Sequence, residues 1–267
     1  MLRIVLGLAL VGVLFGCDED KKKAELLNKT QGDGAADKIA NAVFDAGPTA
    51  SATSSAATAA PAPKKECTES AELTSVDPVM EADIRKKLGK DGGTIKTSEL
   101  PNVKSLDLTK AKSLDELDHC ILPKMTGLKH LFLGPGKVRD LSPIAGLTKL
   151  ESLRASINEV EDLKPLEKLV LLDRLDLGRT HVRDISVLAN LVNVTELQLD
   201  DTQITDLKPL AKMKKLEKLS IKRTQVTDIS PLKDITTLKQ VDVEGCAISN
   251  LDSLASLKAK GLRILTK

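Results

Sequence analysis

Aromatic side chains are almost missing from this sequence. It has three phenylalanines among its 267 residues and neither tryptophan nor tyrosine. Phe15 and Phe44 lie near the N-terminus, so the rest of the chain carries Phe132 alone. The usual aromatic anchors of tight interfaces are therefore scarce. A large excess of basic residues is missing too, because the net charge is +2. This argues against nucleic-acid binding, which requires a one-sided basic face.

Recognisable catalytic motifs are also missing. The sequence has no phosphate-binding loop, nucleophile elbow or zinc-binding helix. The three histidines, His119, His130 and His181, are scattered along the chain. His130 and His181 would lie two strands apart without a third ligand, so we interpret them as solvated surface residues rather than metal ligands. The sequence therefore predicts no enzyme, no metal site and no cofactor.

A strict internal repeat occupies most of the chain after residue 100. Apolar residues recur every 22 positions through six consecutive units, from residue 125 to residue 254. Repeats of this length are typical of solenoids, in which neighbouring coils bury one continuous core. The apolar positions of one unit are Leu169, Leu172, Leu175, Leu177, Val182, Ile185 and Leu188.

Each unit predicts one short strand and a tight return path. The triplet Leu175-Asp176-Leu177 alternates apolar and polar residues, as a strand with one buried face does. Its repetition predicts parallel strands in one sheet, and so short a unit leaves room only for turns or a 3₁₀ helix on the way back. One aspartate recurs at the start of this return path. We expect its carboxylate to accept backbone N–H groups rather than to bind a metal, because each aspartate is a full repeat from the next. The residues are Asp140, Asp162, Asp184, Asp206 and Asp228.

A second column of small residues follows the strands. Threonine hydroxyls in it are expected to donate to a carbonyl of an adjacent coil, and Cys246 is expected to be a small buried group. The column consists of Gly136, Asn158, Thr180, Thr202, Thr224 and Cys246.

Each unit combines regularly spaced leucines, a small polar residue and an Asp-Ile/Leu-x-Pro-Leu segment. From about residue 100 to the C-terminus, this pattern resembles the internalin-like leucine-rich repeats of bacteria. Threonine or cysteine stands at most positions where that family carries asparagine. The resemblance implies an α/β solenoid, which is a leucine-rich-repeat horseshoe with a parallel sheet on its concave side and a short helical N-terminal cap. Asp77-Pro78 predicts the start of the cap helix and Gly89 its end. We therefore expect a cap over residues 67–99 and repeats over residues 100–267, with an irregular first unit.

The N-terminal residues predict export and anchoring. Residues 4–15 form an apolar run that is too short to span a membrane and is typical of a signal peptide. The run ends Leu14-Phe15-Gly16-Cys17, which resembles a bacterial lipobox and implies removal of residues 1–16 and a lipid on Cys17. An ordinary secretory signal is the alternative. Residues 17–66 are rich in Ala, Ser, Thr and Pro and predict a disordered stalk. The expected location is the bacterial cell envelope, lipid-anchored on the periplasmic side or at the cell surface.

Two of the four cysteines are candidates for a disulfide. Cys17 is assigned to the lipid and Cys246 to the column of small residues. Cys67 and Cys120 remain, and both belong to the N-terminal end of the solenoid. In an oxidising compartment we expect a bridge between them, which would tie the cap to the first coil, and two free thiols are the alternative.

The strand residues that face away from the core would carry any recognition. Opposite charges on neighbouring strands form two predicted ladders, one of Arg179, Asp201 and Arg223 and one of Asp200, Lys222 and Glu244. Such charges compensate each other and favour a solvated face.

Phe132 is the only aromatic side chain expected on that face, with arginines nearby, which is the composition of interface hot spots. Alternatively, its ring packs beneath the irregular loop 114–123. The predicted partner-binding residues are Phe132, Arg154, Ile157, Arg179, Asp201 and Arg223.

From these features we expect a non-enzymatic, monomeric, membrane-anchored lipoprotein that binds a protein or peptide on its concave sheet. The alternative is an envelope structural or adhesion protein that binds polysaccharide or peptidoglycan. Sugar sites usually present aromatic platforms, so the scarcity of aromatic residues favours the protein partner.

Overall fold

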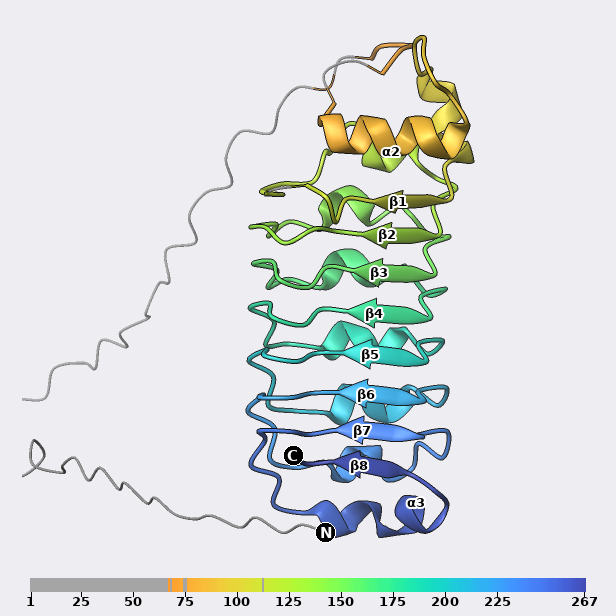
Figure 1. Ribbon diagram of the computed structural model, residues 1–267. Helices are drawn as coiled ribbons and strands as arrows, with labels where there is room; N and C mark the ends of the chain where they lie inside the picture. The colour runs from red at the N-terminus through yellow and green to blue at the C-terminus, as the bar shows by residue number, and fades with distance from the viewer. Residues whose placement is uncertain (1–66, 68, 74–75, 112) are drawn as a thin grey trace, which may run out of the picture. The chain divides into compact units, whose positions relative to one another are not determined.

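The computed structural model describes residues 67, 69–73, 76–111 and 113–267. The expected signal peptide, Cys17 and the stalk lie outside the described residues. The described part forms eight parallel strands in a single open sheet, in the order β1 to β8 (Figure 1). The strands are β1 (Ser105–Asp107), β2 (His130–Phe132), β3 (Ser152–Arg154), β4 (Arg174–Asp176), β5 (Glu196–Gln198), β6 (Lys218–Ser220), β7 (Gln240–Asp242) and β8 (Arg263–Leu265).

The register of the sheet follows the repeat. The central residue of each strand lies beside the central residue of the next, for example Leu153 beside Leu175 and Leu175 beside Leu197. The 22-residue step therefore holds from β2 to β7, and the predicted parallel sheet is confirmed. The first step is longer, because Ser105 pairs with His130, and this is the irregular first coil that the sequence indicates. The central leucines from β1 to β6 are almost fully buried.

Each strand begins one residue earlier than the apolar triplet suggests. The triplet predicts a strand over Leu175–Leu177, whereas β4 covers Arg174–Asp176. Leu177 is still buried and its N–H donates to the carbonyl of Gln198, so the apolar pattern is read correctly but the strand bounds are not. As a consequence, the residue before Leu175 also belongs to the strand and faces away from the core.

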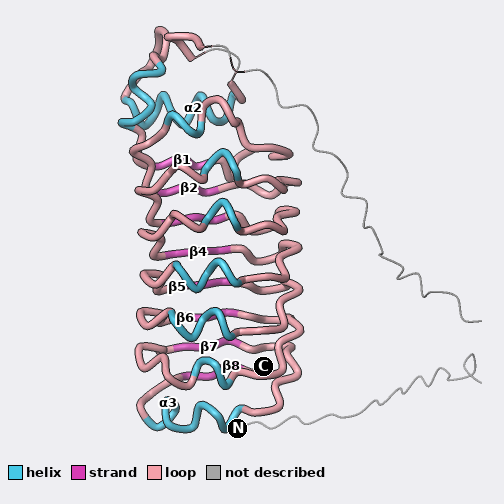
Figure 2. Tube along the Cα trace, turned by 180° about the vertical axis from the view of Figure 1, so that it is seen from behind, coloured by secondary structure: helices cyan, strands magenta, loops and turns pink. Residues whose placement is uncertain are grey.

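The return paths run on the opposite side of the coils and contain short 3₁₀ helices (Figure 2). Their compactness is what a 22-residue coil requires, since an α-helical crossover needs more chain. The 3₁₀ helices are η1 (Thr97–Asn102), η2 (Leu122–Lys124), η3 (Ser142–Ile144), η4 (Lys164–Leu166), η5 (Ser186–Asn190), η6 (Lys208–Lys212), η7 (Ser230–Leu232) and η8 (Leu251–Leu254).

The recurring aspartates start these 3₁₀ helices, as the sequence predicts. In each of five coils the carboxylate accepts the N–H of the first residue of the 3₁₀ helix, at 2.7–2.9 Å. The backbone N–H of Ser186 lowers the pKa of Asp184, and the hydroxyl and N–H of Ser230 lower the pKa of Asp228. These carboxylates therefore have a structural role in the turns.

The column of small residues bonds differently from the expectation. Thr180, Thr202 and Thr224 each donate to a carbonyl three residues earlier in their own coil, at 2.6–2.8 Å, rather than to a carbonyl of an adjacent coil. The Thr224 hydroxyl also lies 3.3 Å from Sγ of Cys246 in the next coil. At this position the threonine hydroxyl lies beside the carbonyl of its own turn, whereas the longer Asn158 amide donates across to Gly134 at 3.1 Å. Cys246 also reaches across, to the carbonyl of Ile221, and is half-buried rather than buried.

Both ends of the repeat array are covered. Helix α2 (Pro78–Leu88) begins at Asp77, whose carboxylate accepts two N–H groups, and ends at Gly89 in the left-handed conformation, as predicted. Its Met80 and Ile84 join the core, and its Asp83 accepts the N–H of Asp107 at the edge of β1. At the other end, helix α3 (Ala255–Ala259), which the sequence pattern did not predict, buries Leu257.

None of the helices in the described part of the chain is long and apolar enough to span a membrane.

Candidate binding surface

Two residues of each strand flank the buried central residue and face away from the core. We call those before the central residue the first column and those after it the second column. The first column is Ser105, His130, Ser152, Arg174, Glu196, Lys218, Gln240 and Arg263. The second column is Asp107, Phe132, Arg154, Asp176, Gln198, Ser220, Asp242 and Leu265. Sequence reasoning largely missed the first column because it began each strand at an apolar residue. The alternation of side chains on both sides of the central leucine is the signal that identifies it.

A hollow of about 340 Å³ lies on this face and extends from β2 to β5. Its walls combine one aromatic ring, two guanidinium groups, two carboxylates and an amide, so aromatic, cationic, anionic and neutral polar groups lie within a small area. The lining residues are Phe132, Ser152, Leu153, Arg154, Arg174, Leu175, Asp176, Glu196 and Gln198.

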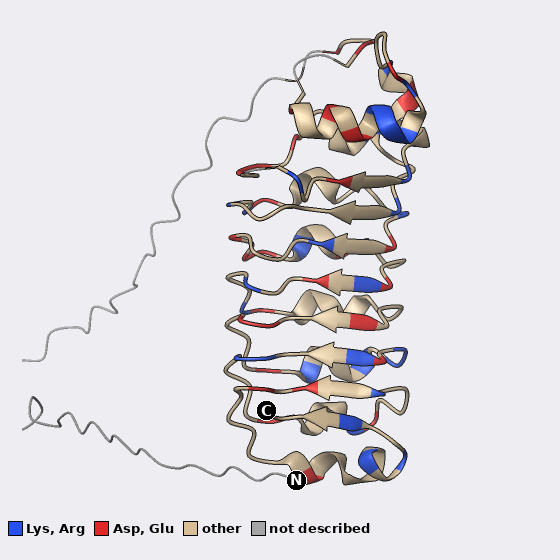
Figure 3. Ribbon diagram, in the orientation of Figure 1, with Lys and Arg blue, Asp and Glu red and all other residues tan. Residues whose placement is uncertain are grey.

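Phe132 lies at the β2 side of the hollow. Its neighbours Leu131 and Leu133 are buried, whereas Phe132 itself is half-buried and does not belong to the hydrophobic core. The ring of His130 lies parallel to that of Phe132, with 6.5 Å between the ring centroids. In Figure 3, the arrow of β2 carries no charged residue, while that of β4 carries both signs. The structure thus places the aromatic ring on the outer face.

Arg154 and Arg174 form the middle of the hollow and are only loosely held. The Nε atom of Arg154 is 3.4 Å from an oxygen of Asp176 and 3.3 Å from the hydroxyl of Ser156. The Nε atom of Arg174 is 3.7 Å from Asp173 and 3.8 Å from Glu196. The two side chains are 53% and 65% exposed. Both guanidinium groups therefore combine long contacts to carboxylates with high exposure to solvent.

The two carboxylates of the hollow have closer partners than these arginines. Asp176 accepts hydrogen bonds from the Ser156 hydroxyl at 2.9 Å and from the Gly178 N–H at 3.0 Å. Glu196 contacts the ammonium of Lys218 at 2.6 Å. The closest contacts of both carboxylates are therefore with neighbouring residues of the sheet rather than with the arginines of the hollow.

The coils after the hollow neutralise their own charges. Asp201 accepts two hydrogen bonds of 2.6 Å from the guanidinium of Arg223, and Arg179 lies 3.6 Å away on the other side. The predicted ladder of these three residues is therefore present. The hydrogen bonds from Arg223 lower the pKa of Asp201, and the same contact raises the pKa of Arg223.

The other predicted ladder is only partly correct. Lys222 contacts Glu244 at 3.2 Å, but its second partner is Asp242 at 2.9 Å. Asp200 instead accepts the backbone N–H of Lys222 and the hydroxyl of Ser220. The difference arises because Asp242 belongs to the outward second column of β7. Hydrogen bonds to Asp242 and then to Glu244 raise the pKa of Lys222.

Ile157, Arg179, Asp201 and Arg223 occupy one position in the turn that leaves each strand. All four have positive φ, between 50° and 59°. This conformation is costly for an L-residue and most unfavourable for a β-branched one. Ile157 is nevertheless 41% exposed there, so the predicted partner-binding set divides in two. Phe132 and Arg154 line the hollow, while these four residues lie in the turns.

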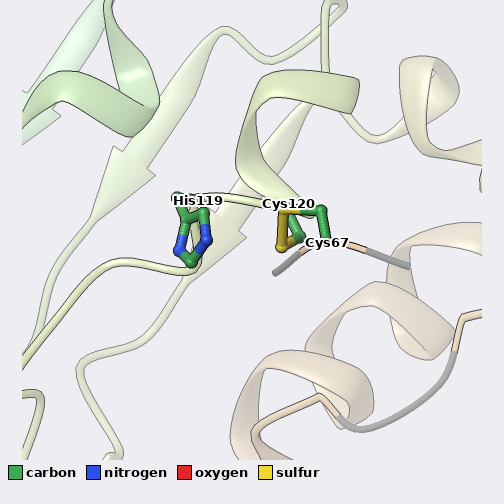
Figure 4. Close-up of side chains that lie close together, drawn as sticks. All are labelled: Cys67, His119 and Cys120. Carbon is green, nitrogen blue, oxygen red and sulfur yellow. A yellow bond between two sulfur atoms is a disulfide. The ribbon is translucent and has the colours of Figure 1, made fainter. Parts of the chain in front are cut away.

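Cys67, His119 and Cys120 form the one group of three potential metal ligands found among the described residues, with ligand atoms within 4.8 Å of one another (Figure 4). The structure joins the two cysteines in a disulfide, with 5.4 Å between their Cα atoms. A disulfide removes the thiolates that would bind a metal. The cluster therefore acts as a covalent link between residues 53 positions apart. His181 lies in a return path, 3.7 Å from Glu161, and not beside His130.

Comparisons with known proteins agree with this architecture. A family model for leucine-rich repeats (two copies) matches residues 192–234. No curated protein matches the chain.

Several solved structures are similar. Internalin C2 of Listeria monocytogenes is 24% identical, with a TM-score of 0.60 over 72% of this chain and 93% of that one. Internalin F of the same organism is 22% identical, with a TM-score of 0.58 over 71% and 62%. A leucine-rich-repeat protein of Leptospira interrogans is 19% identical, with a TM-score of 0.50 over 62% and 50%. The chain therefore has an internalin-like leucine-rich-repeat fold.

Proposed function

We propose that this internalin-like leucine-rich-repeat protein binds a protein partner, as a monomer and without catalysis, in the hollow between β2 and β5. Solenoids present extended surfaces of this kind to their partners. The observation that carries the proposal is the composition of the hollow, in which an accessible aromatic ring lies beside two loosely held arginines. Aromatic residues and arginine are the residues most enriched in interface hot spots.

The later strands support the same choice of site by contrast. Lys222 and Arg223 already have carboxylate partners within 3.2 Å. A partner that used these residues would have to break those contacts first. The hollow has fewer such internal contacts, so binding there costs less.

Photo-crosslinking in the native cells tests the site. A photoreactive amino acid replaces Gln198, which is exposed and lines the hollow, in the full-length protein. The matched control carries it at Lys168, which is exposed on a return path. We expect a discrete protein adduct from position 198 and none of that mass from position 168. Identical adducts from both positions, no protein adduct from position 198, or an adduct with polysaccharide would overturn the proposal.

We also infer that the protein is held at a membrane of the bacterial envelope by a lipid on Cys17, with residues 17–66 as a spacer. The apolar run that ends at Gly16-Cys17 supports this inference. The variant Cys17→Ser should move from the membrane fraction to the soluble fraction or remain unprocessed, whereas Cys246→Ser should fractionate like the parent. If Cys17→Ser is processed and fractionates unchanged, the anchor is wrong.

A further inference from the structure

The arginines of the hollow differ from the paired arginines elsewhere on the protein. Arg223 uses Nε and a terminal nitrogen in hydrogen bonds to the two oxygens of Asp201. Arg139 also uses Nε and a terminal nitrogen, both toward one oxygen of Glu159. Arg154 and Arg174 approach their partners through Nε, at 3.3–3.8 Å. Within the described part of the chain, their terminal nitrogens donate no hydrogen bond to another residue. Each therefore presents unused donors on the edge of the guanidinium group that matches a carboxylate.

The positions of these two arginines on the sheet direct both toward the same space. Arg154 belongs to the second column of β3, and Arg174 to the first column of β4. They are diagonal neighbours across one strand pair, since Ser152 is the direct partner of Arg174 and Asp176 that of Arg154. Diagonal neighbours are within reach of each other's long side chains. A single carboxylate in the hollow can therefore accept from both guanidinium groups.

The aromatic ring adds a second requirement to the ligand. Phe132 pairs directly with Arg154 in the register of β2 and β3. A ligand whose carboxylate lies between the arginines would place a neighbouring apolar group against this ring. Asp176 and Glu196 leave this carboxylate position accessible, because their closest contacts are with Ser156, Gly178 and Lys218.

From this arrangement we propose that the hollow recognises a carboxylate that is next to an apolar side chain, on an extended peptide segment of the partner. The proposal rests on the proposed function and specifies the chemistry of its ligand. Both an acidic side chain and a chain-terminal carboxylate supply this group, and the two sources are separated in the experiment. Arg154 and Arg174 act as binding residues that hold the carboxylate, and Phe132 as the apolar contact.

A titration with short peptides tests the proposal without the native partner. The probes are N-acetyl-Leu-Glu-amide, its Gln counterpart, and N-acetyl-Leu-Leu with a free C-terminal carboxylate. They are added at millimolar concentration to the isotopically labelled full chain, and the Nε–Hε signals of the arginines are followed by NMR. We expect the signals of Arg154 and Arg174 to move with one or both carboxylate peptides and not with the Gln peptide. The peptide that is effective identifies the source of the carboxylate.

Arginine variants test whether Arg154 and Arg174 are the residues that hold the carboxylate. The double change Arg154→Gln and Arg174→Gln should weaken peptide binding about tenfold or more, because charge-assisted hydrogen bonds from both groups are lost. The matched control Arg139→Gln, on a return path, should bind like the parent. Equal shifts with the Glu and Gln peptides, no shift with any peptide, or undiminished binding by the double variant would each overturn the proposal.

The peptide titration and the photo-crosslinking can fail independently of each other. A protein adduct from position 198 combined with no carboxylate-dependent shift would refute the ligand chemistry and leave the proposed function intact. A carboxylate-dependent shift without any protein adduct in cells would refute the proposed function and leave the chemistry of the hollow intact.

Discussion

Strands β2–β4 and strands β5–β7 carry different outer faces over the same core. The leucines beneath both regions repeat in one register and are equally buried. On the outside, β2–β4 offer a phenylalanine and two loosely held arginines, whereas the charges of the later coils are paired at 2.6–3.2 Å. The repeat therefore determines the fold in the same way along the whole sheet. The residues between the leucines determine whether the charged groups of the outer face are already paired with each other or are available to a partner.

The difference between the regions is one of pairing rather than of charge. Both regions carry arginines and carboxylates. In both regions opposite charges fall on directly adjacent coils, but in the later coils they approach to 2.6–3.2 Å, whereas the arginines of the hollow stay 3.4–3.8 Å from their carboxylates. In the hollow, the closest partners of the carboxylates are other residues, and the arginines keep unused donors. A count of charges along the sequence does not distinguish these cases, but the distances between the charged groups do.

The first prediction concerns the end of the solenoid that carries the hollow. The change Cys120→Ala removes the disulfide to Cys67 and should lower the free energy of unfolding by about 2–5 kcal/mol, because the unfolded chain regains the freedom of a long loop. Chemical denaturation of parent and variant without reductant provides the measurement, and Cys246→Ala serves as the single-cysteine control. Peptide mapping that finds both Cys67 and Cys120 alkylatable in the oxidised parent would contradict the bridge.

The second prediction concerns strain beside the hollow. Replacing Ile157 with Asn should raise the free energy of unfolding by about 1 kcal/mol, since Asn tolerates the left-handed conformation far better than a β-branched residue. Thermal and chemical denaturation should both show the gain. Arg179→Asn, at the same turn position in the next coil, should gain less, because arginine is not β-branched. If Ile157→Asn is destabilising, the turn is not strained in the way that its φ indicates.

The third prediction concerns the paired charges of the later coils, whose contribution to the free energy of unfolding should depend on pH. Arg223 lowers the pKa of Asp201 in the folded state, so the pair stabilises the fold above the unfolded-state pKa, and this contribution is lost as the pH falls through the lowered folded-state pKa. Asp201→Asn should therefore cost about 0.2–1 kcal/mol near neutral pH and nothing in strong acid. Denaturation at several pH values measures the difference. The control is Asp91→Asn, an exposed carboxylate without an ion pair among the described residues, and a cost for Asp201→Asn that persists unchanged in acid would argue against the ion pair.

Much of the architecture follows from the repeat itself. The sheet, the compact return paths, the aspartates of the 3₁₀ helices and the cap helix at Asp77–Gly89 were all predictable, because each depends on local pattern and spacing. Helix α3 was not predictable, since residues 255–259 keep the leucine spacing of the repeat and differ from the other coils only in backbone conformation. The acceptors of the column threonines were misjudged as well, because the choice between a carbonyl of the same coil and one of the next depends on the backbone path of the turn.

The binding surface was less predictable than the fold. Phe132 could be identified from the sequence because it is the only aromatic residue beyond the stalk. Arg174 was missed, because its outward direction appears only when the strand is known to begin before Leu175. The pairing of Lys222 with Asp242 likewise depends on which residues share a column across strands. These contacts join residues about one repeat apart, so their prediction requires the register of the strands.

The most direct test of the account is the substitution Phe132→Ala, read out on partner capture and on stability together. The side chain is half-buried on the outer face, so the photo-crosslinked adduct from position 198 should fall about tenfold or more while the melting temperature stays nearly unchanged. The neighbouring change Leu131→Ala is the matched control and should cost roughly 2–5 kcal/mol of stability, because it opens a cavity in the core. Unchanged capture by Phe132→Ala, together with a loss of stability comparable to that of Leu131→Ala, would show that Phe132 is a core residue and that the hollow is not the binding site.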